Sequence, residues 1–363
     1  MPHPRLIVTA ALTVSLSLAA AEPRGIAFHY ATPLTPRELE WYSHFEVLVT
    51  HDPLPRPQVD ALHRRGTKVV LYEWAVAYYD SLKTPWHTRL PASSLLNARP
   101  LRGHLGAADS DAYYYDPATR EHTRDRAQVL ARRLRALGYD GVFFDTTTSA
   151  SVHPEALEEY RRRHPHRSYD AAFAGFLETL RQELRGGVIV TNQGYRAAAH
   201  VLPYADWDVS ESLITHPRDG RFVLRPWNDR KDAWNSTAFL MRNLIAPVRK
   251  AFPRVRYAHI NYVDDASHLA AIVAISYLFD AHPVVAQHDV AQTVESPLLV
   301  LDLGEPVRSY ATHRLFTRGF VAYNPTSKAL RIANSLSYVD AVTGAAVKGT
   351  IVVPPKSARI LRR

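Results

Sequence analysis

Short runs of apolar, β-forming residues alternate with amphipathic stretches of helical periodicity over about 280 residues of this chain. The first three runs, at 25–30, 45–51 and 67–74, have the length and composition of buried strands. Further strands are predicted at 141–145, 188–193, 206–213, 256–263 and 282–289. Eight strands that alternate with helices are typical of a (β/α)8 TIM barrel, in the α/β class. An open doubly wound sheet is the alternative, but the first strand–helix turn lacks a glycine-rich dinucleotide fingerprint.

The two ends of the chain depart from this pattern. Residues 1–21 combine one early arginine, an apolar run and three alanines, Ala19 to Ala21, which is the pattern of a secretory signal peptide. The apolar run is shorter than a spanning helix needs, so we expect a secreted or periplasmic protein with no stable membrane insertion after cleavage. From 305 to 363, short strands and turns replace the helices and predict a small antiparallel β-sandwich. The catalytic barrel is then expected over 22–304.

Composition excludes several kinds of chemistry. The chain has no cysteine, which rules out disulfides, thiolate metal sites and cysteine nucleophiles. Its 44 basic and 35 acidic residues give a net charge of +9, which suits either attraction to a polyanion or simply a solvated basic surface. We prefer the solvated surface, and no nucleic-acid motif accompanies the charge. Because no Walker loop, metalloprotease, nucleophile-elbow or kinase signature occurs either, we expect no cofactor. We also expect the protein to be a monomer.

Active sites of such barrels lie at the carboxyl ends of the strands. The predicted strand ends carry the carboxylates Asp145 and Glu211. They also carry polar and aromatic residues that we expect to bind substrate, namely Tyr30, Asp52, Glu73, Trp74, Asn192 and Tyr262. Glycosidic cleavage needs two facing carboxyl groups, one to protonate the leaving oxygen and one to attack the anomeric carbon or activate water. Asp145 and Glu211 end strands two apart in the ring, so we predict them as the catalytic pair. The structural alternatives are a helix cap for Asp145 and an ion pair for Glu211.

The segment from 75 to 121 is rich in tyrosine, tryptophan, proline and serine and shows no clear period. A loop of this length in a compact domain is usually functional. Its aromatic residues, among them Tyr115, could stack on sugar rings, as could Trp74 just before the segment. The alternative for each of these aromatic rings is that it packs the loop against the barrel.

Three segments in this order, LGYDGVFFDT, VIVTNQG and ADWDVSESLIT, resemble the barrels of the endo-α-1,4-polygalactosaminidase family and related extracellular glycosidases. The C-terminal segments LDLGEPV, RLFTRGFVAYNPTS and VVPPKSARIL resemble the β-sandwich that closes many glycosidase barrels. The resemblance implies that Asp145 is the nucleophile and Glu211 the general acid/base, with Asn192 and Glu73 lining the pocket. The stretch LYEWAVAYY lacks the Gly-Glu dipeptide of the polygalactosaminidases proper, which leaves the sugar open.

The expected function is therefore a secreted glycoside hydrolase that acts on a polysaccharide or oligosaccharide. A barrel of the same fold that binds glycans without cutting them is the first alternative. A metal-dependent polysaccharide deacetylase is the second, since the chain has 18 histidines and His-Asp pairs at 51–52 and 288–289. The histidines are scattered rather than clustered, so we expect no metal site.

Overall fold

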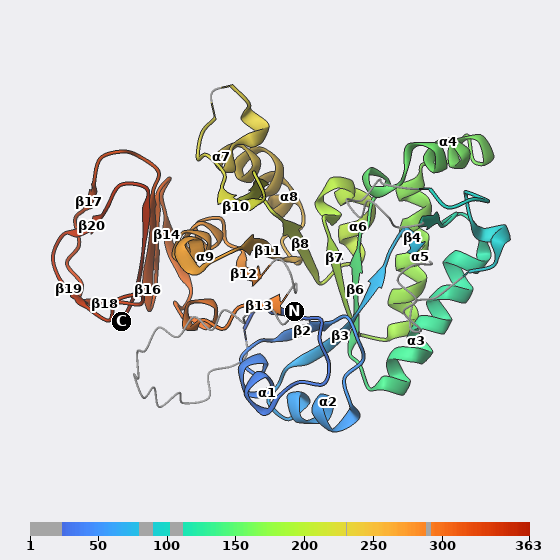
Figure 1. Ribbon diagram of the computed structural model, residues 1–363, viewed down its shortest axis with the longest axis horizontal. Helices are drawn as coiled ribbons and strands as arrows, with labels where there is room; N and C mark the ends of the chain where they lie inside the picture. The colour runs from blue at the N-terminus through green and yellow to red at the C-terminus, as the bar shows by residue number, and fades with distance from the viewer. Residues whose placement is uncertain (1–23, 80–89, 102–111, 230, 288–291) are drawn as a thin grey trace.

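A computed structural model describes residues 24–79, 90–101, 112–229, 231–287 and 292–363. Its main sheet contains the eight parallel strands β1 (Ile26–His29), β2 (Val47–Thr50), β3 (Lys68–Trp74), β6 (Gly141–Asp145), β7 (Val188–Asn192), β8 (Trp207–Glu211), β11 (Arg256–Val263) and β12 (His282–Gln287). Each pairs in parallel with the next along the chain. The predicted α/β barrel class is confirmed (Figure 1).

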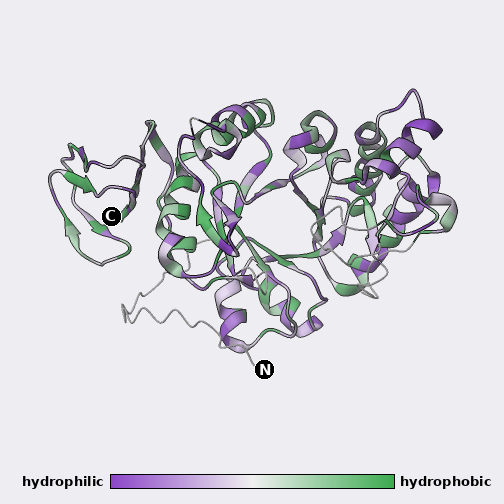
Figure 2. Ribbon diagram, turned by 45° about the horizontal axis from the view of Figure 1, so that its top comes forward, coloured by the Kyte–Doolittle hydropathy of each residue, from purple (hydrophilic) through white to green (hydrophobic). Residues whose placement is uncertain are grey.

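A short ninth strand completes the ring. β13 (Gln292–Thr293) runs antiparallel to β12 and lies beside β1. The amide nitrogen of Phe28 in β1 donates a hydrogen bond to the Thr293 hydroxyl at 2.8 Å. A side-chain hydrogen bond therefore joins the first and last strands, whereas the other neighbouring strands of the sheet are joined by backbone hydrogen bonds. Figure 2 shows the strands and helices arranged in a ring.

The helices cover the outside of this ring. They are α1 (Pro36–Tyr42), α2 (Arg56–His63), α3 (Arg126–Leu137), α4 (Pro154–Arg163), α5 (Tyr169–Leu184), α6 (Ala198–Val201), α7 (Thr237–Leu240), α8 (Ala246–Ala251) and α9 (Leu269–Leu278). The shorter helical turns are η2 (Ala92–Ser94), η3 (Glu121–Asp125), η4 (Ser149–Ser151), η5 (Gly194–Ala197), η6 (Leu202–Tyr204), η7 (Ala233–Asn235), η8 (Met241–Ile245), η9 (Ala266–His268) and η11 (Pro297–Val300). Within the described residues, no helix has the length and apolar character to cross a membrane.

Alternate residues of each strand face two different cores. Val70 and Tyr72 of β3 belong to the core inside the ring, with Phe143 of β6. Val69 and Leu71 of the same strand belong to the core between the sheet and the helices. Because successive side chains of a strand point to opposite faces, this alternation decides which residues at a strand end reach the interior of the barrel.

The segment predicted as an aromatic loop after β3 contains two strands. β4 (Ala77–Tyr79) and β5 (Ala112–Tyr114) form an antiparallel ribbon in which Tyr78 lies opposite Tyr113. A second excursion follows β8, where β9 (Thr215–Arg218) and β10 (Arg221–Leu224) form another antiparallel pair. Figure 1 shows the two ribbons near β6 and β8, the strands that carry the predicted catalytic carboxylates.

Antiparallel sheets form the C-terminal part of the chain. One has the order β14 (Pro306–Ser309), β15 (His313–Phe316), β16 (Gly319–Asn324), β21 (Ser357–Arg362), β18 (Tyr338–Asp340) and β19 (Ala346–Val347). β17 (Leu330–Ile332) pairs with β20 (Ile351–Val353). Phe320, Ile351 and Leu361 form a core shared by the two sheets. The other face of the larger sheet packs on α9 of the barrel (Figure 1).

Candidate active site

Three neighbouring strands end in the side chains that form the centre of the site. Asp145 ends β6, Asn192 ends β7 and Glu211 ends β8. The Asn192 amide nitrogen donates a hydrogen bond to Asp145 Oδ1 at 2.7 Å and another to Glu211 Oε2 at 3.0 Å. The structure thus brings three sequence-predicted residues together, with both carboxyl groups bound to one amide nitrogen.

Two tyrosine hydroxyls bind the remaining carboxyl oxygens. The Tyr72 hydroxyl donates to Asp145 Oδ2 at 2.6 Å, and the Tyr262 hydroxyl donates to Glu211 Oε1 at 2.9 Å. Burial, together with the nearby carboxylates, raises the pKa of both phenols above the ordinary tyrosine value. The hydroxyls therefore keep their protons and act as donors toward the two carboxyl groups.

The carboxyl group of Asp145 is half-buried and close to a second acid. Burial, followed by the negative charge of Glu211, raises the pKa of Asp145 to about 6. Hydrogen bonds from Tyr72 and Asn192 oppose that rise, because they stabilise the ionised form. Asp145 is thus ionised at neutral pH but takes up a proton in mildly acidic solution.

The backbone turns sharply after each of these three residues. Thr146, Gln193 and Ser212, which directly follow Asp145, Asn192 and Glu211, have φ angles of 58°, 59° and 56°. This left-handed conformation is uncommon outside glycine and is a clear outlier for a β-branched threonine. Strained backbone of this kind concentrates at sites where the position of a functional side chain is over-determined by its surroundings.

Aromatic rings surround the carboxyl pair. The Trp74 ring centroid lies 5.4 Å from that of Tyr72 and 4.6 Å from that of Tyr79 on the β4–β5 ribbon. Tyr30 lies 5.6 Å from Tyr72, and burial raises its pKa well above the ordinary value, so its hydroxyl stays protonated. Trp74 and Tyr30, both predicted site residues, therefore join the same cluster.

Asp52 is connected to this aromatic cluster through His51. Its carboxylate Oδ1 is 2.9 Å from His51 Nδ1, and the His51 ring lies 5.3 Å from Tyr30 and 5.0 Å from Tyr72. The Asp52 side chain is 37% exposed, so it is open to a ligand at the rim of the cluster.

Comparisons with known proteins bear on the fold. No family model matches the chain, and no curated protein matches it. Among solved structures, the glycoside hydrolase domain of PelA from Pseudomonas aeruginosa is similar over 77% of this chain and 97% of that one, with 21% identity and a TM-score of 0.53. Amy13B from Eubacterium rectale is similar over 95% of this chain and 96% of that one, with 9% identity and a TM-score of 0.53. The fold is that of glycoside hydrolase barrels.

Two predicted residues lie outside the site, and Glu73 is the first. Its carboxylate is fully buried on the helix-facing side of β3, where Oε1 lies 3.3 Å from Arg126 Nη2 of α3. The reason is the alternation of the strand, which turns Tyr72 and Trp74 inward and Glu73 outward. This corrects the expectation that Glu73 lines the pocket. Arg126 also donates hydrogen bonds to the backbone carbonyls of Trp74 and Ala75, and so holds the end of β3.

Tyr115 is the second. It is fully buried, with the Arg126 guanidinium 4.4 Å from its ring centroid, and its backbone carbonyl accepts a hydrogen bond from Tyr169. Tyr115 therefore packs the long segment against α3 and α5, and the expectation that it stacks on a sugar is corrected. Conversely, the prediction omitted Tyr72. β3 pairs with β6 so that Trp74 lies opposite Asp145. Because side chains two positions apart along a strand point to the same face, this pairing identifies Tyr72 as a residue that points into the barrel.

The described residues contain no group of three or more histidine, aspartate or glutamate side chains placed to hold a metal ion. The His51–Asp52 pair stands without a third such ligand in that part of the chain. The other pair considered for a deacetylase, His288 and Asp289, lies outside the described residues. The site geometry therefore offers acid–base and nucleophilic chemistry from carboxyl groups.

Proposed function

We propose that the protein is a glycoside hydrolase that cleaves O-glycosidic bonds of a polysaccharide with Asp145 and Glu211. The observation that carries the proposal is the pair of carboxyl groups at the ends of β6 and β8, the two strands that flank β7, joined by the Asn192 amide in a glycosidase-type barrel. Among the described residues, no arginine or lysine contacts either carboxylate, which distinguishes the pair from a structural ion pair. The shared fold alone does not imply activity, so the support lies in this geometry.

The separation of the two carboxyl groups favours retention of anomeric configuration. Because both bound oxygens lie within 3.0 Å of one nitrogen, they are no more than about 6 Å apart. Retaining glycosidases hold their carboxyl groups about 5–5.5 Å apart, whereas inverting enzymes leave about 6.5–9.5 Å for a water molecule. The short separation suits direct attack by one carboxylate on the anomeric carbon.

Hydrogen-bond lengths suggest which group carries the charge. Asp145 accepts bonds of 2.6 and 2.7 Å, while Glu211 accepts bonds of 2.9 and 3.0 Å. Shorter hydrogen bonds are typical of an ionised acceptor. We therefore assign the role of nucleophile to Asp145 and the role of general acid/base to Glu211.

These assignments give a balanced two-step reaction. In the first step, Asp145 forms a bond to the anomeric carbon while Glu211 gives its proton to the departing glycosidic oxygen. The Tyr72 and Asn192 donors hold the Asp145 carboxylate in one orientation for this attack. In the second step, Glu211 takes a proton from water, the water oxygen attacks the anomeric carbon, and the bond to Asp145 breaks.

The charge at the centre restricts the sugar. The site contains the carboxyl groups of Asp145 and Glu211, with Asp52 at the rim, and none of the described residues that touch the pair is a lysine or arginine. A uronic acid carboxylate would meet like charges at short range, which disfavours acidic polymers. A neutral or amino sugar fits better, in line with the resemblance to polygalactosaminidases. With the signal-peptide pattern at 1–21, we place this activity outside the cytoplasm.

The test is hydrolysis of a panel of neutral, amino-sugar and acidic polysaccharides by the mature chain, beside Asp145→Asn and Glu211→Gln. We expect both variants to fold and to lose more than about 100-fold in rate, as removal of a nucleophile or a general acid does. Nuclear magnetic resonance of the first product should show the anomeric configuration of the substrate. Binding of a polysaccharide without any cleavage would replace this proposal with the glycan-binding barrel.

A further inference from the structure

A separate pocket lies against the face of the β4–β5 ribbon that points away from Trp74. Tyr79 contacts Trp74, and its neighbour Tyr78 points to the opposite face because side chains alternate along a strand. The pocket has a volume of about 330 Å³, and its described lining includes Tyr78, Tyr113, Leu90, Leu95, Asn97 and Arg163. None of the described residues of the catalytic centre lines it.

Two aromatic rings form one wall of this pocket. Tyr78 and Tyr113 are directly opposite each other across the ribbon, and both are half-buried. Cross-strand partners lie close enough for their side chains to present one continuous surface. Flat rings with polar edges suit the apolar C–H faces and polar rims of sugars, and they lose little conformational entropy when they bind.

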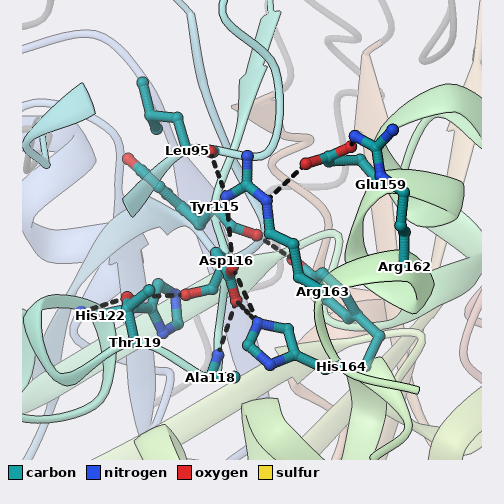
Figure 3. A network of polar contacts seen from close by, with 11 residues as sticks. Leu95, Tyr115, Asp116, Ala118, Thr119, His122, Glu159, Arg162, Arg163 and His164 are labelled. Carbon is teal, nitrogen blue, oxygen red and sulfur yellow. Dashed lines mark hydrogen bonds and ion pairs between the residues drawn. The ribbon is translucent and has the colours of Figure 1, made fainter. Parts of the chain in front are cut away.

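Arg163 is the charged residue of the described lining, and Figure 3 shows its polar contacts. Its Nε atom donates to Glu159 at 2.5 Å, and its Nη1 atom donates to the Leu95 carbonyl at 3.0 Å and lies 3.5 Å from Asp116. Among the described residues, Nη2 has no hydrogen-bond partner, and the side chain is 36% exposed. Because two carboxylates compensate its charge, the guanidinium is suited to a neutral hydroxyl more than to an anion.

The lining is held rigidly by internal hydrogen bonds. Asp116, which is 1% exposed, accepts hydrogen bonds from His164 at 3.0 Å and from the Ala118 amide at 3.1 Å (Figure 3). The Asn97 amide donates to the Ala112 carbonyl at 2.9 Å, and its oxygen accepts from the Tyr114 amide at 2.7 Å. A pocket whose walls are already ordered loses less entropy on binding than a flexible surface.

We infer that this pocket is a secondary carbohydrate-binding site, which holds a neutral sugar unit of the polymer away from the catalytic carboxylates. The inference rests on the proposed function for the identity of the polymer. Since the ribbon contacts Trp74 on one face and forms the pocket on the other, a chain that passes over the end of β3 can reach both places. The pocket then raises the affinity for long chains without changing the chemistry at Asp145.

The experiment separates binding from cleavage. In the Asp145→Asn background, Tyr78→Ala/Tyr113→Ala is compared with its parent by affinity electrophoresis in gels that contain soluble starch, chitosan or xylan. We expect the polysaccharide in the gel to retain the double variant at least about threefold less strongly than its parent, because the aromatic contacts to the sugar are lost. Tyr310→Ala, which removes a 45% exposed tyrosine of the turn between β14 and β15, is the matched control and should leave retention unchanged.

The results distinguish this inference from the proposed function. With Asp145 restored, the double variant should cut short oligosaccharides at the wild-type rate but show a raised KM for the polymer. Equal retention of the double variant and its parent, or no retention of the parent in any gel, overturns the secondary site. Loss of retention in the double variant of a protein that cuts nothing supports the pocket and overturns the hydrolase. If the double variant does not fold, Tyr113→Leu, which keeps an apolar contact without the flat ring, provides the same comparison.

Discussion

Replacing Tyr72 by phenylalanine tests the assignment of Asp145 as the ionised member of the proposed catalytic pair. The Tyr72 hydroxyl donates the 2.6 Å hydrogen bond to Asp145 Oδ2 and thereby lowers the pKa of Asp145, which burial and Glu211 raise to about 6. A hydrogen bond to a charged group contributes about 1.5–3 kcal/mol, and one pKa unit corresponds to about 1.4 kcal/mol. Because a water molecule can partly replace the lost hydrogen bond at this half-buried carboxylate, we take the lower end of that energy range, about 1.5 kcal/mol. The pKa of Asp145 should then rise from about 6 to about 7.

The assay is the pH dependence of kcat/KM on the polysaccharide that the wild type cuts best. A nucleophile must be ionised, so activity is present above the pKa of Asp145 and is lost as the pH falls through it. The acidic limb of Tyr72→Phe should lie about one pH unit above that of the wild type, which gives about a tenfold extra loss at pH 5 and little change at pH 8. Tyr262→Phe, which removes the hydrogen bond to Glu211 instead, is the control and should leave the acidic limb near its wild-type position. An acidic limb of Tyr72→Phe that coincides with that of the wild type, or moves to lower pH, refutes Asp145 as the ionised group.

Three further predictions concern the scaffold of the site and are measured by urea or thermal unfolding. Arg126→Met removes the guanidinium that lies 3.3 Å from the buried Glu73 carboxylate, which Arg133 approaches to 4.0 Å, and should lower the free energy of unfolding by about 3 kcal/mol, with much of the loss recovered when Glu73→Leu is added. Gly141→Ala places a Cβ atom 1.9 Å from a carbonyl oxygen of β7 and should cost about 3 kcal/mol, whereas Gly175→Ala in α5 meets only a flexible arginine tip at 3.4 Å and should gain up to about 1 kcal/mol. Thr146→Gly relieves a φ of 58° and should raise the free energy of unfolding by up to about 1 kcal/mol; a clear loss of stability would show that the turn is not strained.

The residues of the candidate site were predictable because strand ends are visible in the sequence. Asp145, Asn192 and Glu211 each close an apolar run, and barrel topology alone places the ends of neighbouring strands together. Their shared contact through the Asn192 amide depends on side-chain rotamers and on strand register, which no local pattern encodes. The left-handed turns after each of these residues could not be predicted from the sequence either, because threonine, glutamine and serine do not indicate a positive φ.

It was harder to predict which side chains of a strand point into the barrel and which point toward the helices. Strands of a parallel barrel are apolar on both faces, so KVVLYEW shows no alternation that separates Tyr72 from Glu73. A carboxylate at a strand end was taken as a pocket residue, but Arg126 of α3 provides it with a buried partner outside the ring. That partner lies more than 50 positions away along the chain, beyond the reach of any short-range signal.

The junction between the first strand, β1, and the last strand of the ring, β13, has a consequence for biogenesis. Phe28 and Thr293 lie 265 positions apart, so the contact that joins β1 to β13 is among the most distant in the chain. Contacts of this kind form slowly, because a long loop must close before they contribute any stability. A polypeptide that leaves the ribosome with its N-terminus first therefore carries an unpaired β1 edge until nearly the whole barrel has been synthesised. A fragment that ends after β12 but before residue 292 contains all eight parallel strands and yet lacks the hydroxyl that joins the two edges, so we expect such fragments to aggregate through β1.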